Sequence, residues 1–187
     1  MFYCFLWMFV LIGCKKTTLH TISVEEFAQF VEETAYVTDA EKFAWSIKQL
    51  TIFDYVVVEH VDWRCPDGEQ KARNGFPVTQ VSYNDALAYA NWAGVNIPTY
   101  EEYWEIASAD ARFINSGTSQ ILPNNQVSVI GNVWDITEVD TYGRIRLAGG
   151  SYLCRKYTCD GTSPDRQLYA DRLTGNTHIG FSVLVKR

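Results

Sequence analysis

The 187-residue chain has few of the residues from which zinc and nucleic-acid sites are usually built. Histidine occurs only three times, and no second pair of cysteine or histidine ligands accompanies the two cysteines near the C-terminus, which argues against a structural zinc site. No run of lysine or arginine is longer than two, and the formal net charge is −6. The sequence therefore argues against nucleic acid as a partner.

The chain also lacks an apolar run long enough to cross a bilayer, for which a helix needs about 20 residues. Residues 1–13 are almost wholly apolar, and residues 11–14 read Leu-Ile-Gly-Cys, which resembles the signal of bacterial lipoproteins. We therefore expect a signal peptide over residues 1–13, lipidation of Cys14 and a tether over residues 14–22. The protein would then be exported and anchored by lipid to a bacterial membrane, on the periplasmic side or at the cell surface.

One feature disagrees with that interpretation, because no lysine or arginine precedes the apolar run as it does in signal peptides. The alternative is a buried N-terminal strand in which Cys14 is an inert thiol.

Internal repeats and low-complexity tracts are absent from the remainder of the chain. Its length suits one hydrophobic core and hardly two. A hydrophobic content of 47% and an aromatic content of 14% are typical of a well-packed globular domain. We expect one domain over residues 23–187, present as a monomer.

Helix and strand signals alternate irregularly along this domain, which predicts an α+β fold. Three helix starts pair an N-cap residue with an acidic residue three positions later, at Ser23, Ser82 and Thr99. The first helix should run to about residue 33, and Gly94 should end the second. Residues 110–126 read as loop, and strands are expected over residues 53–58, 127–134, 144–147 and 179–185.

Cys154 and Cys159 are the main chemical signal, five positions apart behind a Gly-Gly-Ser turn. Such a pair can hold one soft metal ion or form a disulfide, and thiolates select cuprous copper, zinc or iron–sulfur centres. Arg155 and Lys156 lie between the sulfurs and would favour the thiolate form. Cys65 is left over, so one thiol outside the signal stays unpaired in an oxidising compartment. The residues leave the choice between metal and disulfide open.

Blocks distributed over most of the chain resemble, in order, those of the formylglycine-generating enzymes, also called sulfatase-modifying factors. They cover residues 27–42, 45–46, 63–64, 76–86, 92–94, 97–99, 131–135, 149–154 and 180–181. They include Gly131-Asn132-Val133-Trp134-Asp135 and Gly149-Gly150-Ser151-Tyr152-Leu153-Cys154, and the specificity lies in the order of the blocks. The resemblance implies the modified C-type-lectin-like fold of that family, an α+β arrangement with little regular secondary structure.

The resemblance also implies an activity, copper-dependent oxidation of a cysteine in a target sulfatase to formylglycine. Cys154 and Cys159 match the family's copper-binding positions, and the target cysteine, in a Cys-x-Pro-x-Arg motif, joins as third ligand before dioxygen binds. Ser151 would donate a hydroxyl near the reacting atoms, and Trp134 would wall the site. On sequence alone, a turn hydroxyl and a core aromatic are the alternative interpretations of these two residues.

The resemblance further implies a calcium site from the carbonyls of Gly131 and Val133 and the carboxylate of Asp135, with Ser128 where asparagine is usual. Hard oxygen ligands of this kind suit calcium, although Asp135 could instead cap a turn.

Departures at Arg155 and Asp160, together with the trimmed length that includes a short loop over residues 110–126, favour a second function. Arg155 replaces a histidine of the enzymes, Asp160 replaces an arginine and would raise the pKa of the neighbouring thiol, and His178 replaces an asparagine. The alternative is therefore a catalytically inactive ligand-binding or scaffold lipoprotein on the same fold.

Overall fold

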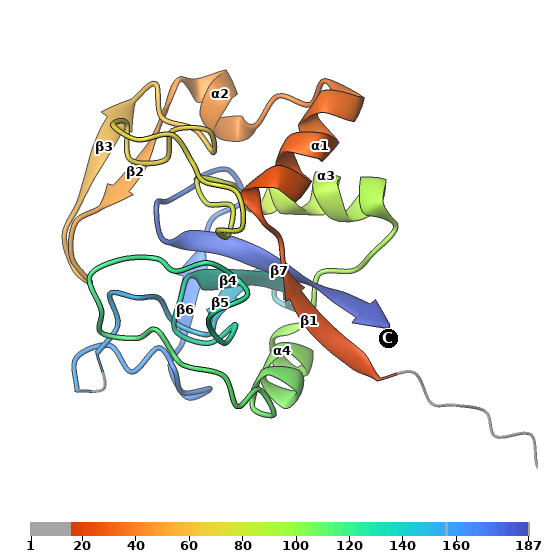
Figure 1. Ribbon diagram of the computed structural model, residues 1–187, viewed down its shortest axis with the longest axis vertical. Coiled ribbons are helices and arrows are strands. Elements are labelled where there is room, and N and C mark those ends of the chain that lie inside the picture. The colour runs from red at the N-terminus through yellow and green to blue at the C-terminus, as the bar shows by residue number, and fades with distance from the viewer. Residues whose placement is uncertain (1–15, 156, 187) are drawn as a thin grey trace, which may run out of the picture.

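The computed structural model describes residues 16–155 and 157–186, and its centre is a five-stranded sheet in the order β1–β7–β4–β5–β6 (Figure 1). Its strands are β1 (Thr17–Thr21), β4 (Trp134–Val139), β5 (Ile145–Ala148), β6 (Leu168–Ala170) and β7 (Ile179–Lys186). β7 pairs in parallel with β4, and the other neighbours are antiparallel. A separate hairpin consists of β2 (Trp45–Gln49) and β3 (Tyr55–Glu59).

Strand β1 corrects the expected tether over residues 14–22. Its five residues pair with β7 in unbroken register, from Thr17 opposite Lys186 to Thr21 opposite Ser182. β-branched threonines suit an extended, half-buried strand, and this segment closes one edge of the central sheet. The domain therefore includes residues before position 23. The predictions of a signal peptide and of lipidation at Cys14 concern residues outside those described.

The described part of the chain forms four helices around the sheet: α1 (Val24–Thr34), α2 (Asp39–Phe43), α3 (Tyr83–Ala93) and α4 (Tyr100–Ala107). Each begins at a capping box, and Gly94 ends α3 in the left-handed conformation with φ of 65°. The three predicted helices are confirmed, whereas the short α2 was missed. Figure 1 shows α1 and α3 together on one side of the sheet and α4 on the other. No described helix is long and apolar enough to cross a membrane.

The predicted strands agree with the structure less well than the predicted helices do. The predicted strand over residues 127–134 is wrong except at its last residue, because Ser128 and Gly131 donate their N–H groups to the carbonyls of Phe113 and Gly149 in other loops instead of to a neighbouring strand. β3 starts two residues later than predicted, while β5 and β7 agree within one residue. Strands β2 and β6 were missed.

Aromatic packing joins the helices to the sheet. The fully buried Phe27 of α1 lies within 5.4–6.3 Å, between ring centroids, of Phe30, Trp63, Tyr89 and Phe181. These rings come from α1, α3, β7 and the loop after β3. The cluster is thus the contact through which the helices hold the central sheet.

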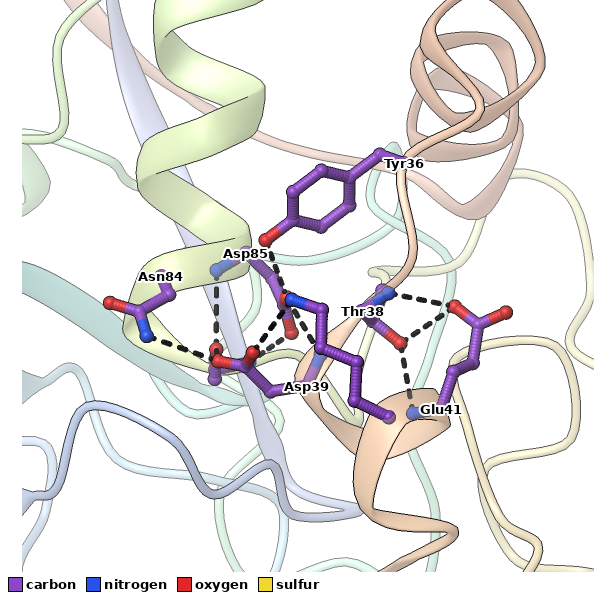
Figure 2. A network of polar contacts seen from close by, with 8 residues as sticks. Tyr36, Thr38, Asp39, Glu41, Asn84 and Asp85 are labelled. Atoms are coloured by element: carbon purple, nitrogen blue, oxygen red, sulfur yellow. Dashed lines mark hydrogen bonds and ion pairs between the residues drawn. The ribbon is translucent and has the colours of Figure 1, made fainter.

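A polar network fixes α2 and, with it, the start of the hairpin (Figure 2). The buried carboxylate of Asp85 accepts hydrogen bonds from the hydroxyl of Tyr36 and the backbone N–H of Asp39. Asp39 accepts in turn from Ser82 and from Lys42. Burial raises the pKa of Asp85. Because buried carboxylates are tolerated only when they are hydrogen-bonded, this network holds α2 to the start of α3.

Candidate functional site

A cavity of about 410 Å³ opens beside the two C-terminal cysteines. Its inner wall carries the chemically distinctive side chains Trp134, Ser151, Cys154, Cys159 and His178. The hairpin contributes Ile47, Gln49, Ile52, Phe53 and Tyr55, and the segment after the cysteines contributes Arg166 and residues 168–171. Three parts of the chain that are distant in sequence therefore meet around the cysteine pair.

Glycines allow the cysteine loop to fold back on itself. Gly149 and Gly150 have φ values of 86° and 72°, in the region that side chains disfavour. A Cβ atom on Gly150 would lie 2.6 Å from the backbone of Gly161, and one on Gly161 would lie 2.8 Å from the ring of Trp134. The Gly-Gly turn and Gly161 thus permit a close approach that places both cysteines against the Trp134 wall.

The sulfur atoms of Cys154 and Cys159 are 2.8 Å apart, and both cysteines are free. The hydrogen bond between them and burial raise the pKa of Cys154 well above its ordinary value. Cys159 has the opposite shift, because the hydrogen bond from Cys154 lowers its pKa to about 6, with further help from the Gly161 N–H and the Arg166 guanidinium. Cys159 is therefore the thiolate of the pair at neutral pH.

This result corrects the expectation that Asp160 raises the pKa of its neighbouring thiol. Arg166, which the sequence interpretation missed, supplies a positive charge instead. Its position depends on Tyr100, whose hydroxyl donates to the carbonyls of Pro164 and Arg166 at 2.8 and 3.1 Å. No spacing rule marks an arginine seven residues beyond a cysteine. Arg155 is exposed, and Lys156 lies outside the described residues.

Ser151 lies between Cys154 and His178. Its backbone N–H donates to the Cys154 sulfur at 3.4 Å, and its hydroxyl lies 4.0 Å from that sulfur and 3.3 Å from Nδ1 of His178. Burial lowers the pKa of His178 to about 4, so its ring is neutral at pH 7. The structure thus places Ser151 and Trp134 in the cavity wall. His178, which the sequence analysis noted only as a replacement of the family's asparagine, lies in the same wall.

We expect the burial of His178 to make the protein less stable in mild acid. The unfolded chain takes up a proton near pH 6.5, whereas the folded ring resists it until about pH 4. This stability is therefore complete above pH 6.5 and is lost progressively as the pH falls to 4, by about 3 kcal/mol in all. Urea unfolding at several pH values should show this slope, and His178→Asn should flatten it. Identical slopes in both proteins would contradict the assignment.

The four residues expected to bind calcium do not fit such a site. Asp135 is the one carboxylate among them, and its two oxygens accept hydrogen bonds from the hydroxyls of Ser182, at 2.6 Å, and Tyr103, at 3.0 Å. The Ser128 hydroxyl accepts from the N–H of Ile130. Burial raises the pKa of Asp135 to about 7. Calcium sites use about six to eight oxygen ligands, whereas both Asp135 oxygens are already occupied by hydroxyl donors. Asp135 joins β4 to β7 and α4 instead of capping a turn.

Comparison with protein families assigns residues 17–126 to the sulfatase-modifying factor enzyme 1-like domain. The chain belongs to this family. The match begins at Thr17, the first residue of β1, which agrees with the place of that strand in the domain. It ends before the cysteine pair, so the cavity residues after position 126 are assigned by geometry and not by the match.

Relatives in this family carry two kinds of name. The formylglycine-generating enzyme of Thermomonospora curvata is 38% identical over 107 residues, 48% of this chain and 35% of that protein. The inactive C-alpha-formylglycine-generating enzyme 2 of Bos taurus is 34% identical over 106 residues, 46% of this chain and 35% of that protein. The formylglycine-generating enzyme of Mycobacterium tuberculosis is 27% identical and covers 87% of this chain and 84% of its own. The chain thus matches about a third of the length of the first two relatives.

Two solved structures share the fold. PvdO from Pseudomonas aeruginosa aligns with a TM-score of 0.58 at 13% identity, covering 89% of this chain and 78% of its own. CarF aligns with a TM-score of 0.52 at 15% identity, covering 89% and 84%. The predicted α+β fold of the sulfatase-modifying factor family is confirmed.

Proposed function

We propose that this protein is a copper-dependent oxidase that converts a cysteine of a target sulfatase to formylglycine. The observation that carries the proposal is the pair of free cysteines, with sulfurs 2.8 Å apart, on the wall of a cavity of about 410 Å³. Membership of a family that includes named formylglycine-generating enzymes supports it.

The donor set suits a soft, monovalent ion. Thiolates select cuprous copper over hard cations such as calcium and magnesium. Among the described residues no group of three or more histidine, cysteine, aspartate or glutamate side chains could hold a metal ion. Zinc, which takes four protein ligands in structural sites, would therefore lack partners, whereas Cys154 and Cys159 are sufficient for a low-coordinate copper site that leaves room for the target thiol.

Bound copper would supply the activation of dioxygen. In the overall reaction the target cysteine loses a C–H and a C–S bond, its sulfur leaves as hydrogen sulfide, and water supplies the aldehyde oxygen. Dioxygen accepts the two electrons released and becomes hydrogen peroxide, or is reduced fully to water where two external thiols form a disulfide and add two more electrons. The substrate is therefore a reduced cysteine, and the oxidant is dioxygen.

The chain's own groups have defined tasks in this proposal. Cys159 enters as a thiolate whose charge Arg166 offsets. Ser151 holds the Cys154 sulfur through its N–H, and a His178 ring protonated on Nδ1 would leave the Ser151 hydroxyl free to donate to that sulfur. The buried indole of Trp134 excludes water from one side. Electrostatic interactions between these groups and the substrate are stronger in such water-poor surroundings.

The test uses the reduced, metal-free protein. We expect one equivalent of cuprous ion to bind tightly against a colorimetric chelator. The loaded protein should then consume oxygen and form an aldehyde on a peptide with the Cys-x-Pro-x-Arg motif, detected by mass spectrometry and by hydrazide capture. The same peptide with serine in place of cysteine is the control. Aldehyde that forms equally without copper would refute the proposal.

A catalytically inactive binding protein is the second candidate. It is favoured by Arg155 and Asp160, which depart from the enzymes' residues, and by the inactive relative from Bos taurus. Tight copper binding without aldehyde formation, or a cysteine pair that forms a stable disulfide and binds no copper, would support this candidate over the oxidase.

A further inference from the structure

The β2–β3 hairpin carries a cluster of exposed apolar side chains. Its strands, their turn and the end of α2 expose Phe43, Trp45, Leu50, Phe53, Tyr55, Val56 and Val57. Three of them are more than half exposed, Phe53 at 69%, Val57 at 61% and Tyr55 at 60%. Soluble proteins seldom expose contiguous apolar surface unless it contacts something. Val56 projects from the opposite side of the two strands to Tyr55 and Val57. We call the side that carries Trp45, Tyr55 and Val57 the hairpin face.

The hairpin face continues into the cysteine cavity. Ile47 pairs with Val57, and Gln49 pairs with Tyr55. Directly opposed residues of an antiparallel pair project to the same side of the sheet, so these four side chains share one face. Ile47, Gln49 and Tyr55 also line the cavity. A chain lying on the hairpin face would therefore lead to the cysteine pair.

The hydrogen-bond pattern identifies the free backbone groups of β3. The N–H of His60 donates to the carbonyl of Ala44, and the N–H of Leu50 donates to the carbonyl of Asp54, so these two pairs are hydrogen-bonded. Hydrogen-bonded and non-hydrogen-bonded pairs alternate along antiparallel strands. Three residues of β3 therefore turn their N–H and C=O groups away from β2, namely Tyr55, Val57 and Glu59.

The two edges of the hairpin differ. On β2, the carbonyl of Ile47 accepts from the N–H of Thr177, and the N–H of Gln49 donates to the Thr177 hydroxyl. On β3, the outward groups have no hydrogen-bond partner within residues 16–155 and 157–186. Figure 1 shows the hairpin at the periphery of the molecule. An exposed edge of this kind accepts an extended chain as an added strand.

Charge on this surface favours a basic occupant. Asp54 and Glu59 on the hairpin, and Asp171 at the cavity, are exposed and have no ion-pair partner among the described side chains. The single cation of the two strands, Lys48, is paired with Glu69 at 2.8 Å. A segment with lysine or arginine among apolar residues is therefore complementary to the surface.

We propose that β3 binds an extended segment of the target protein as a third strand, apolar on alternate residues and carrying lysine or arginine. The identity of that partner rests on the proposed function, since the segment is the one flanking the reacting cysteine. Alternate side chains would pack on Tyr55 and Val57, because successive residues of a strand point to opposite faces. Backbone pairing holds the segment, and the hairpin face selects its sequence.

Binding of a labelled peptide to the metal-free protein tests this proposal without any chemistry. The peptide carries the Cys-x-Pro-x-Arg motif, with serine in place of cysteine, and an alternating valine–lysine flank. Val57→Pro removes an outward N–H that β2 does not use, and proline is tolerated at such edge positions. We expect at least about tenfold weaker binding by fluorescence anisotropy, because a main-chain hydrogen bond is lost and the ring blocks approach. Val57→Thr, which keeps the N–H, should bind within about threefold of the original protein.

A second measurement keeps the test independent of the variant's folding. Peptides are N-methylated at one flank residue at a time. Methylation at every second residue should abolish binding, and methylation at the intervening residues should not affect it, as strand pairing requires. The proposal is overturned if N-methylation weakens binding equally at all flank positions, or if Val57→Pro binds the peptide as tightly as the original protein. It is also overturned if the protein dimerises through β3 and does not bind the peptide. If the peptide binds but the copper-loaded protein forms no aldehyde on its cysteine-containing form, the proposed function is refuted and this inference stands.

Discussion

Replacing Cys159 by serine is expected to abolish copper uptake and aldehyde formation. Cys159 is the thiolate of the pair, and a serine hydroxyl is a harder donor that stays protonated at neutral pH. Loss of an outer-shell partner costs a metal site roughly 10–100-fold in affinity, so loss of one of two ligands should exceed that. Titration of the reduced variant with cuprous ion against a chelator measures the effect.

Cys65→Ser is the matched control for this experiment. Cys65 is also free, but it lies in the turn between residues 62 and 68 and does not line the cavity. Its replacement should leave copper uptake unchanged and alter stability by less than about 1 kcal/mol. Equal copper binding by Cys159→Ser and the original protein, or a loss in Cys65→Ser, would show that the ligand set is wrong.

Local signals in the sequence predict the helices well and the strands poorly. The boxes at Ser23, Ser82 and Thr99 act within one turn of chain, so sequence spacing alone reveals them. Strands β1 and β6 have weak intrinsic signals and exist because β7 and β5 offer them an edge. Such pairing depends on contacts that are distant in sequence, which no local pattern carries.

In the cavity, too, local sequence patterns predict some residues, whereas others depend on contacts between distant parts of the chain. Spacing behind a glycine turn indicates the pair Cys154 and Cys159, and the structure brings them together with Ser151 and Trp134. Arg166 faces Cys159 from a loop whose backbone is held by the hydroxyl of Tyr100 of α4. The hairpin joins the cavity because Thr177 pairs with β2. Both contributions depend on tertiary contacts and could not be predicted from the sequence.

Phe27→Ala should cause the largest loss of stability, because Phe27 is fully buried and contacts four aromatic rings that join α1, α3 and β7. Truncation of a buried phenylalanine costs about 3–5 kcal/mol, through lost burial and the cavity that remains. Since domains are stable by only about 5–15 kcal/mol, the midpoint of urea unfolding should fall steeply with an unchanged slope. Phe113→Ala is the matched control, because that ring is 60% exposed and should cost less than about 1 kcal/mol. Similar losses in the two variants would mean that the aromatic cluster is not the contact that holds the helices to the sheet.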